Sequence, residues 1–318
     1  MPAGYSEYQK GKDLKEKEQY KEAFVCFSKA AELGNIEACN EVGECYFYGN
    51  GVAQDNEKAF SWYRKAAIQG HSTAQVNLGY CYSNGVGVEQ DYSKSFEWYQ
   101  KAADQGNPDG LLNLGNRYNH GQGVKADPQK AYSLYISAAE KGNAMGYFLA
   151  GVMLYYEDEG IGQDYAKAYK LFNQCAEKTN HRQARYYLGE MSLLGKGVSK
   201  NIQAARVHLS LSAFQGYKDA IELIEKHSSE LFDEKLTSGF YNWLMAQTVR
   251  HEDMKQSPDY QMFMLVHVCM ERGLDYYAIM GVVSSRLSEI AFQSINREQA
   301  IMINYFELAK KWMSMVAK

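Results

Sequence analysis

Histidine and cysteine are the residues of this chain best suited to hold a metal ion or to carry out acid–base and thiol chemistry. The sequence has seven histidines and six cysteines, but they form no Cys-x-x-Cys or His-Glu-x-x-His motif. Gly-x-Ser-x-Gly and Gly-Lys-Ser/Thr motifs are also absent. We therefore predict no catalytic residue, no metal site and no cofactor, with structural or solvated roles for the histidines. Only His120 is kept as a candidate, for partner binding, because it lies on a predicted first helix.

A Gly-x-Gly-Val sequence recurs along the chain and offers a second possible chemistry. Glycine loops of this kind can cradle phosphate at a helix N-terminus. In three copies an aspartate follows, whose carboxylate would repel an anion. We therefore favour turns in which glycine supplies a positive φ and aspartate caps the next helix. The pairs are Gly49 and Asp55, Gly85 and Asp91, and Gly121 and Asp127.

These turns belong to a longer repeat of 36 residues. Its phase is marked by Gly43, Gly79, Gly115 and Gly151. Ala-Ala-x-x-Gly follows the first three turns, preceded by Trp-Tyr in two copies and Leu-Tyr in the third, with small and apolar residues at steps of three and four. This spacing predicts a helix, a glycine-rich turn, a second helix and a glycine stop in every block.

Taken together, Leu-Gly-x-x-Tyr, Gly-x-Gly-Val, Asp-x-x-Lys-Ala, Trp-Tyr and Ala-Ala-x-x-Gly resemble the Sel-one-like repeat (SLR) family, which is related to tetratricopeptide repeats. The resemblance covers residues 36–216 as five repeats, of which the fourth and fifth depart from the pattern. It implies an all-α fold, a right-handed α-solenoid superhelix of helix-turn-helix repeats. Residues 1–35 resemble a tetratricopeptide unit, through Gly11, Ala23 and Phe27.

Residues 217–318 leave the repeat pattern and are richer in methionine and large apolar residues. Because the last unit of a solenoid must cover an exposed apolar face, we predict a C-terminal helical cap there. Its Met302, Phe306, Trp312 and Met313 could alternatively contact a partner helix or a second copy in a homodimer. The predicted helices of the cap span 231–250, 258–272, 276–292 and 297–316.

Charge and hydropathy favour partners other than nucleic acid or membrane. The net charge is −4, and no basic stripe is present to contact phosphates. The N-terminal residues are polar, and the most apolar stretch, 262–270, is too short to span a bilayer. The cysteines show no repeated pairing, so we expect free thiols. We predict a cytoplasmic protein, and the repeat style favours a bacterial source.

In related solenoids the first helices line a concave groove, so the resemblance implies a partner-binding surface on those helices. Asparagine can pair with the main chain of an extended peptide, and aromatic rings offer rigid apolar contact area. Alternatively, these are ordinary solvated residues, or Phe148, Tyr155 and Tyr156 pack under the cap. The candidates are Asn40, Glu44, Phe47, Tyr48, Tyr80, Asn84, Asn116, Asn119, His120, Phe148, Tyr155, Tyr156 and Tyr186.

Three functions are compatible with such a chain. We favour a non-catalytic adaptor or scaffold that binds a protein or peptide segment in the groove. The alternative is an immunity or inhibitor protein that neutralises a cognate toxin or enzyme, with residues 228–318 gripping the target. A hydrolytic enzyme is a minor alternative, because no nucleophile and base converge in the sequence.

Overall fold

The computed structural model describes residues 3–156, 160–215 and 217–227 together with Leu231, and all regular structure in this part of the chain is α-helical. The chain divides into two compact units, Met1–Lys178 and Thr179–Lys318, which we describe separately. The predicted cap helices lie outside the described residues, apart from Leu231. The prediction of an all-helical repeat fold is confirmed.

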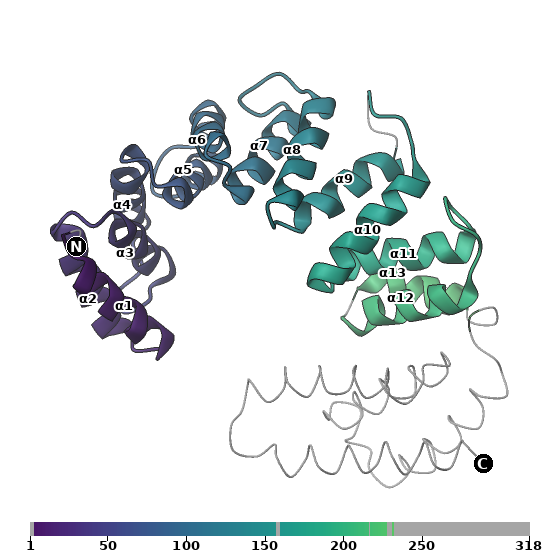
Figure 1. Cartoon of the computed structure of the whole chain (residues 1–318), viewed down its shortest axis with the longest axis horizontal. Coiled ribbons are helices and arrows are strands. Elements are labelled where there is room, and N and C mark those ends of the chain that lie inside the picture. Colours follow the sequence, from purple (N-terminus) through teal and green to yellow (C-terminus); the bar gives the residue numbers. More distant parts are fainter. Residues whose placement is uncertain (1–2, 157–159, 216, 228–230, 232–318) are drawn as a thin grey trace, which may run out of the picture. The chain divides into compact units, whose positions relative to one another are not determined.

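Unit 1 is built from helix pairs that follow one another in chain order (Figure 1). The first helices of the pairs are α1 (Tyr5–Glu16), α3 (Ile36–Tyr48), α5 (Ser72–Asn84), α7 (Pro108–His120) and α9 (Met145–Tyr156). The second helices are α2 (Tyr20–Glu32), α4 (Asn56–Ile68), α6 (Tyr92–Asp104), α8 (Pro128–Glu140) and α10 (Tyr165–Thr179). Figure 1 shows α1, α3 and α5 on the inner side of this row, and α2, α4 and α6 on its outer side.

Unit 2 continues the same design with one further pair. It consists of α11 (Arg182–Leu194) and α12 (Ile202–Phe214), and α13 (Lys218–Lys226) packs against both. Leu209 of α12 is fully buried in the core of this unit. Helix α13 contains Ala220, which is fully buried.

Aspartate side chains cap the second helices α4, α6, α8 and α10 of unit 1, whereas α2 begins after Gln19 without such a bond. Asp55 accepts a hydrogen bond from the backbone N–H of Lys58 at 3.0 Å. Asp91 does the same for Lys94 at the start of α6, also at 3.0 Å. Each aspartate satisfies a backbone donor that the helix leaves unpaired, and its negative charge suits the positive end of the helix dipole.

The two glycines of each turn have different tasks. Gly49 ends α3 in the left-handed region with φ of 75°, and Gly51 has φ of 77°. A Cβ on Gly51 would also overlap the carbonyl oxygen of Tyr20, which belongs to the preceding repeat. Gly87 meets Asn56 in the same way. The second glycine therefore lets one repeat approach the next, and the predicted turn function is confirmed.

Within each pair of unit 1, a ring of the second helix rests on a glycine of the first. A Cβ on Gly79 would lie 2.7 Å from the ring of Tyr99, closer than packed atoms allow. The ring of Tyr99 is only 2% exposed, so it has little room to withdraw. The same contact joins Gly11 and Phe27, Gly43 and Tyr63, Gly115 and Tyr135, and Gly151 and Phe172.

Aromatic contacts join successive repeats. One phenylalanine ring in each of α2, α4 and α6 meets a tyrosine of the next first helix edge-on, a geometry that aromatic pairs favour. The centroid separations lie between 5.4 and 5.5 Å. A lysine ammonium also lies 5.4 Å from the centroids of two of these tyrosine rings, those of Tyr46 and Tyr82. The pairs are Phe24 and Tyr46, Phe60 and Tyr82, and Phe96 and Tyr118.

The glycine–ring contact predicts the sign of a substitution. Alanine normally stabilises a helix interior by about 0.5–1 kcal/mol relative to glycine. For Gly79→Ala we expect instead a loss of about 1–3 kcal/mol in the free energy of unfolding, because the added methyl group displaces the ring of Tyr99. Urea unfolding followed by circular dichroism measures this change.

Gly162→Ala is the matched control for that experiment. A Cβ at Gly162 meets no atom within 4 Å, and its backbone does not adopt a positive φ. We expect this variant to unfold at the wild-type urea concentration or slightly above it. If Gly79→Ala proved as stable as Gly162→Ala, the ring contact would not limit the spacing of the helices.

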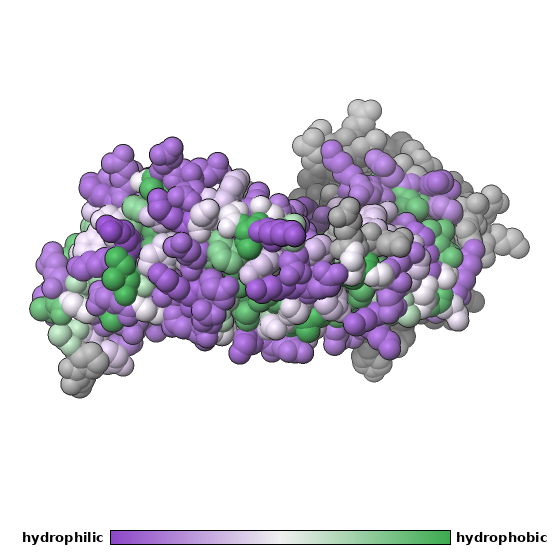
Figure 2. Space-filling view, turned by 90° about the horizontal axis from the view of Figure 1, so that it is seen from above, coloured by the Kyte–Doolittle hydropathy of each residue, from purple (hydrophilic) through white to green (hydrophobic). Residues whose placement is uncertain are grey.

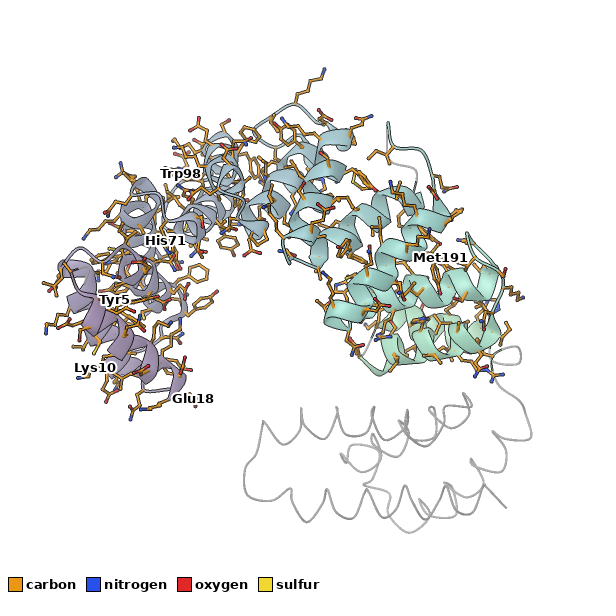
Figure 3. The ribbon with its side chains drawn as sticks, viewed as in Figure 1. Tyr5, Lys10, Glu18, His71, Trp98 and Met191 are labelled. Carbon is orange, nitrogen blue, oxygen red and sulfur yellow. The ribbon has the colours of Figure 1, made fainter. Side chains whose placement is uncertain are left out.

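His71 caps α5 where the neighbouring repeats use asparagine. Figure 3 labels this residue at the passage from α4 to α5. Its Nδ1 accepts a hydrogen bond from the backbone N–H of Ala74 at 3.1 Å, as Asn35 does from Ala38 in α3. Only the imidazole with an unprotonated Nδ1 can accept this bond. Burial lowers the pKa of His71, although the nearby glutamates of α3 act in the opposite direction.

We predict that His71→Asn removes an acid sensitivity of the fold. The pKa of the folded state is lowered, so the cap contributes fully above about pH 6.5 and is lost as the pH falls towards the lowered value. At pH 5 the variant should therefore gain about 1 kcal/mol over the wild type, and the gain should shrink at pH 8. Thermal unfolding at both pH values tests this, with the exposed His120→Asn as control. An equal difference at both pH values would contradict the cap.

Candidate functional site

One row of side chains runs along each first helix of unit 1 with steps of four, three and four residues. This spacing places the four members on one side of a helix. Both ends of every row are exposed, and the middle positions are half-buried or exposed. We call the four rows together the first-helix face. They are Glu37, Glu41, Glu44 and Tyr48 in α3; Thr73, Asn77, Tyr80 and Asn84 in α5; Asp109, Asn113, Asn116 and His120 in α7; and Met145, Leu149, Val152 and Tyr156 in α9.

A polar network joins three repeats across this face. The ammonium of Lys15 in α1 donates to Oε2 of Glu41 at 2.7 Å and to Oε2 of Glu44 at 3.1 Å. The amide of Asn40 donates to Oε1 of Glu44 at 3.0 Å and accepts from Nδ2 of Asn77 in α5, also at 3.0 Å. Glu44 is thus held from two sides, which fixes the α3 row in place.

The charges of the network reinforce one another. Burial by itself disfavours the charged form of Lys15, but the hydrogen bond to Glu41 and the charges of Glu44 and Glu41 outweigh it and raise the pKa of Lys15. The side chains of Glu41 and Glu44 are 18% and 28% exposed. At this exposure water screens the pair less than at the open surface, so the ion pairs contribute to stability as well as to position.

An aromatic cluster lies at the α3 and α5 rows of the face, formed by Tyr48 and Tyr80 and by Phe47 beside them. Phe47 is half-buried and meets Tyr48 edge-on at 4.8 Å between ring centroids and Tyr80 of the next repeat at 5.9 Å. Tyr48 is 64% exposed and Tyr80 is 44% exposed. Both tyrosines therefore offer an open ring surface, while the partly buried ring of Phe47 packs against each of them.

The amide-rich part of the face lies on α5 and α7. Asn84 is exposed and donates to the backbone carbonyl of Tyr80 at 3.0 Å. Asn116 is half-buried, and its Oδ1 accepts a hydrogen bond from the hydroxyl of Tyr135 at 2.8 Å. Asn119 is half-buried and His120 is exposed at the end of α7. These predicted residues lie where a partner could reach them.

Three predicted site residues are not open in the structure. Asn40 is 4% exposed, and its side-chain amide is hydrogen-bonded to Glu44 and Asn77 within the network. Phe148 and Tyr155 are 8% and 5% exposed, because both rings pack against Phe172 of α10. We therefore leave these three out of the candidate surface. Tyr156, in contrast, is 62% exposed and remains in it.

Tyr186 belongs to unit 2 and is considered only there. It is half-buried, and its ring meets those of Tyr187 and Tyr217 at 5.3 Å each. Tyr217 directly precedes α13, so these rings help to hold α13 against α11. Its assignment to a shared partner-binding surface stays a prediction.

Sequence reasoning missed Lys15, Glu41 and Asn77. Glu41 and Asn77 occupy the same position in consecutive repeats, 36 residues apart, so the repeat contained a signal for them. The steps between Glu37, Glu41 and Glu44 were a second signal, because they mark a single helix side. Lys15 had no such signal, since it lies in the first repeat and reaches the network through a long side chain.

Cysteine and metal chemistry find little support in the described part of the chain. Cys39, Cys45 and Cys81 are free and buried there, and burial raises the pKa of Cys45 to about 11 and that of Cys81 to about 12. Such thiols are poor nucleophiles at neutral pH. No group of three or more potential metal ligands was found among the described residues.

Among the described residues, no helix combines the length and the apolar character that crossing a bilayer requires. Figure 2, which looks down on the molecule from above Figure 1, shows a face that is mainly hydrophilic with small, separate hydrophobic patches. Scattered patches of this kind are normal on a protein surface and suggest no site on this side.

Comparison with known proteins agrees with the repeat geometry. The Sel1 repeat model matches residues 3–35, 36–71, 72–107, 108–143, 144–180 and 182–217, and so includes the segment predicted to be a tetratricopeptide unit. A Sel1 repeat protein from Oxalobacter formigenes is 32% identical, with a TM-score of 0.65; the match covers 69% of this chain and 89% of that chain. No curated protein matches the chain.

A second solved structure shows the same fold. It is a protective antigen present in uropathogenic Escherichia coli strains and displays an SLR fold. Its sequence is 24% identical, with a TM-score of 0.64, and the match covers 98% of this chain and 69% of that chain. At this identity the likeness concerns the fold alone.

The network predicts a measurable coupling between Lys15 and Glu41. In a double-mutant cycle of Lys15→Met and Glu41→Gln, we expect a coupling of about 0.5–1 kcal/mol in the free energy of unfolding. The coupling should weaken in 1 M salt, where the Debye length falls to about 3 Å. The comparison pair is Lys29 and Glu7, a single contact of 2.8 Å with side chains 63% and 27% exposed. Equal couplings for both pairs would show that the network adds nothing to an ordinary surface ion pair.

Proposed function

The chain belongs to the Sel1 repeat family, and from this premise we propose that its first-helix face binds a segment of a partner protein without changing it chemically. Sel1 repeat proteins are scaffolds for protein interactions. One observation carries the proposal: Tyr48 and Tyr80 stand open on the face while Phe47 supports both. Large rings of this kind are common binding hot spots.

Preorganisation supports this role. Binding costs entropy for every side chain that must be ordered at the interface. The contacts of Phe47 with Tyr48 and Tyr80 already restrict both tyrosines, and the bonds of Lys15 and Asn40 restrict Glu44. A partner would therefore meet side chains that are largely in position before it arrives.

The amides add directional contacts suited to an extended peptide. Asn84 and Asn113 each donate to a backbone carbonyl of their own helix, which leaves the amide oxygen of both side chains as an acceptor. Asn116 accepts from Tyr135 through Oδ1, which leaves its N–H groups as donors. Acceptors and donors on neighbouring helices can pair with the N–H and C=O groups of a peptide main chain.

Several predictions of the sequence have no test among these observations. The inhibitor hypothesis and the homodimer rest on residues 228–318, almost all of which lie outside the described residues. The absence of catalysis, cofactors and nucleic-acid binding, the cytoplasmic location and the bacterial source also stay predictions. The adaptor is preferred because its binding surface lies in the described part of unit 1.

The proposal predicts that two tyrosines dominate partner affinity. After the partner has been identified by cross-linking to the full chain, isothermal titration calorimetry with the purified partner should show a dissociation constant at least about tenfold higher for Tyr48→Ala/Tyr80→Ala. The reason is the loss of two open ring surfaces. Circular dichroism should show an unchanged fold, since both residues are exposed.

Ile68→Ala is the matched control. Ile68 lies on α4 of the same repeat as Tyr48 and is 63% exposed, against 64% for Tyr48. Its removal should leave the dissociation constant unchanged, because α4 is a second helix. Wild-type affinity in the double tyrosine variant, or an equal loss in Ile68→Ala, would rule out the first-helix face as the binding surface.

A further inference from the structure

The α3 row of the first-helix face differs from the others in its charge. Three glutamates, Glu37, Glu41 and Glu44, precede Tyr48 along one side of the helix. Lys15 pairs with Glu41 and Glu44, so the three carboxylates share one cation in the network. Glu37 is exposed at the start of the row. The α3 end of the face therefore carries a negative charge that the network does not cancel.

Neighbouring groups respond to this charge. Burial raises the pKa of Tyr8, and Glu41 and Glu37 raise it further. Burial likewise raises the pKa of Tyr63, with Glu44 acting in the same direction. Lys15 acts in the opposite direction on Tyr8. The glutamates of the α3 row thus act on one group of α1 and one group of α4.

The other three rows do not supply a balancing cation. The rows of α5, α7 and α9 contain no lysine or arginine, and Asp109 adds another carboxylate at the start of the α7 row. From α3 to α9 the rows pass from acidic through amide to apolar side chains. A cationic group of a partner would thus find its strongest attraction at the α3 end.

We infer that the partner segment bound by the first-helix face carries an arginine, which stacks on the open rings of Tyr48 and Tyr80 beside Glu44. This inference rests on the proposed function and names the class of its partner. A guanidinium suits the place because it stacks on aromatic rings and pairs with carboxylates in the same plane. Glu44 lies one helical turn before Tyr48, which puts its carboxylate beside the rings.

Lysine satisfies these conditions less well than arginine. Its ammonium is strongly hydrated and acts as a point charge, so it gains less from two aromatic faces. The chain's own Lys15 already provides such a point charge to Glu41 and Glu44. A planar group can instead cover the tyrosine rings and still approach the outer side of the acidic row.

Selection from a random dodecapeptide display library on the immobilised full chain tests the inference. We expect arginine to be enriched in the selected peptides, and fluorescence anisotropy with one of them should show binding about tenfold weaker for Glu44→Gln. Replacing the arginine of that peptide by lysine should also weaken binding. Glu57→Gln, an equal change of charge at an exposed position of α4, is the control and should bind as the wild type does.

Glu37→Gln is a second charge variant, which separates a loss of binding from a loss of folding. Glu44 takes part in the network, so its substitution could loosen α3, whereas Glu37 is exposed. Thermal unfolding should be unchanged in Glu37→Gln, and its affinity for the arginine peptide should still fall, by less than in Glu44→Gln. Unchanged affinity in both variants would overturn the inference.

The remaining outcomes separate the inference from the proposed function. Selected peptides without arginine that are lost on Tyr48→Ala/Tyr80→Ala would overturn the inference and leave the proposed function intact. Peptides that bind both the tyrosine and the glutamate variants as tightly as the wild type would count against both. A selection that enriches no peptide would overturn the inference, while the calorimetric experiment with the partner would still decide the function.

Discussion

The helix packing of unit 1 depends on the contact between one aromatic ring and one glycine in each helix pair. The ring of Tyr63, Tyr99 or Tyr135 occupies the space that a Cβ would need at Gly43, Gly79 or Gly115. This contact sets how closely the two helices approach, and its return every 36 residues sets the repeat. Because interiors are packed as densely as organic crystals, such a contact allows little variation. The turn glycines extend the constraint to neighbouring repeats, since Gly51 and Gly87 lie directly against the preceding one.

The contact between ring and glycine involves only one side of each first helix, so it places no packing requirement on the opposite side. Gly79, Leu78 and Ala74 face the core of their repeat and are buried, while Thr73 and Tyr80 on the same helix are exposed. The buried positions repeat with little change, because the ring contact and the close approach of the helices require small or apolar residues there. The exposed positions change from repeat to repeat, from acidic in α3 to apolar in α9. The scaffold and the binding surface thus occupy different sides of one helix.

This division explains what could be predicted from the sequence. The helices, turns and aspartate caps follow from local rules and recur, so the sequence predicts them correctly. The burial of Asn40, Phe148 and Tyr155 escaped prediction because membership of a first helix does not show which way a side chain faces. Residues at positions 40 and 47 of α3 lie beside the open row and turn partly towards the core, and Phe148 and Tyr155 hold the equivalent positions in α9. The network escaped prediction as well, because a lysine of one repeat joins glutamates of the next only in three dimensions.

The separation of the two sides has a consequence for how such a protein acquires a partner. A substitution in the open row removes few buried contacts, so it costs little stability. A change at a glycine that packs against a ring disturbs the packing of both helices of the pair. Glu41, Glu44 and Asn77 are exceptions, because the network holds them to Lys15 or Asn40. Charge at the α3 end is therefore tied to the stability of this network. In the proposed function, the acidic end would anchor a partner, and the amide and apolar rows that follow would adjust which sequence fits.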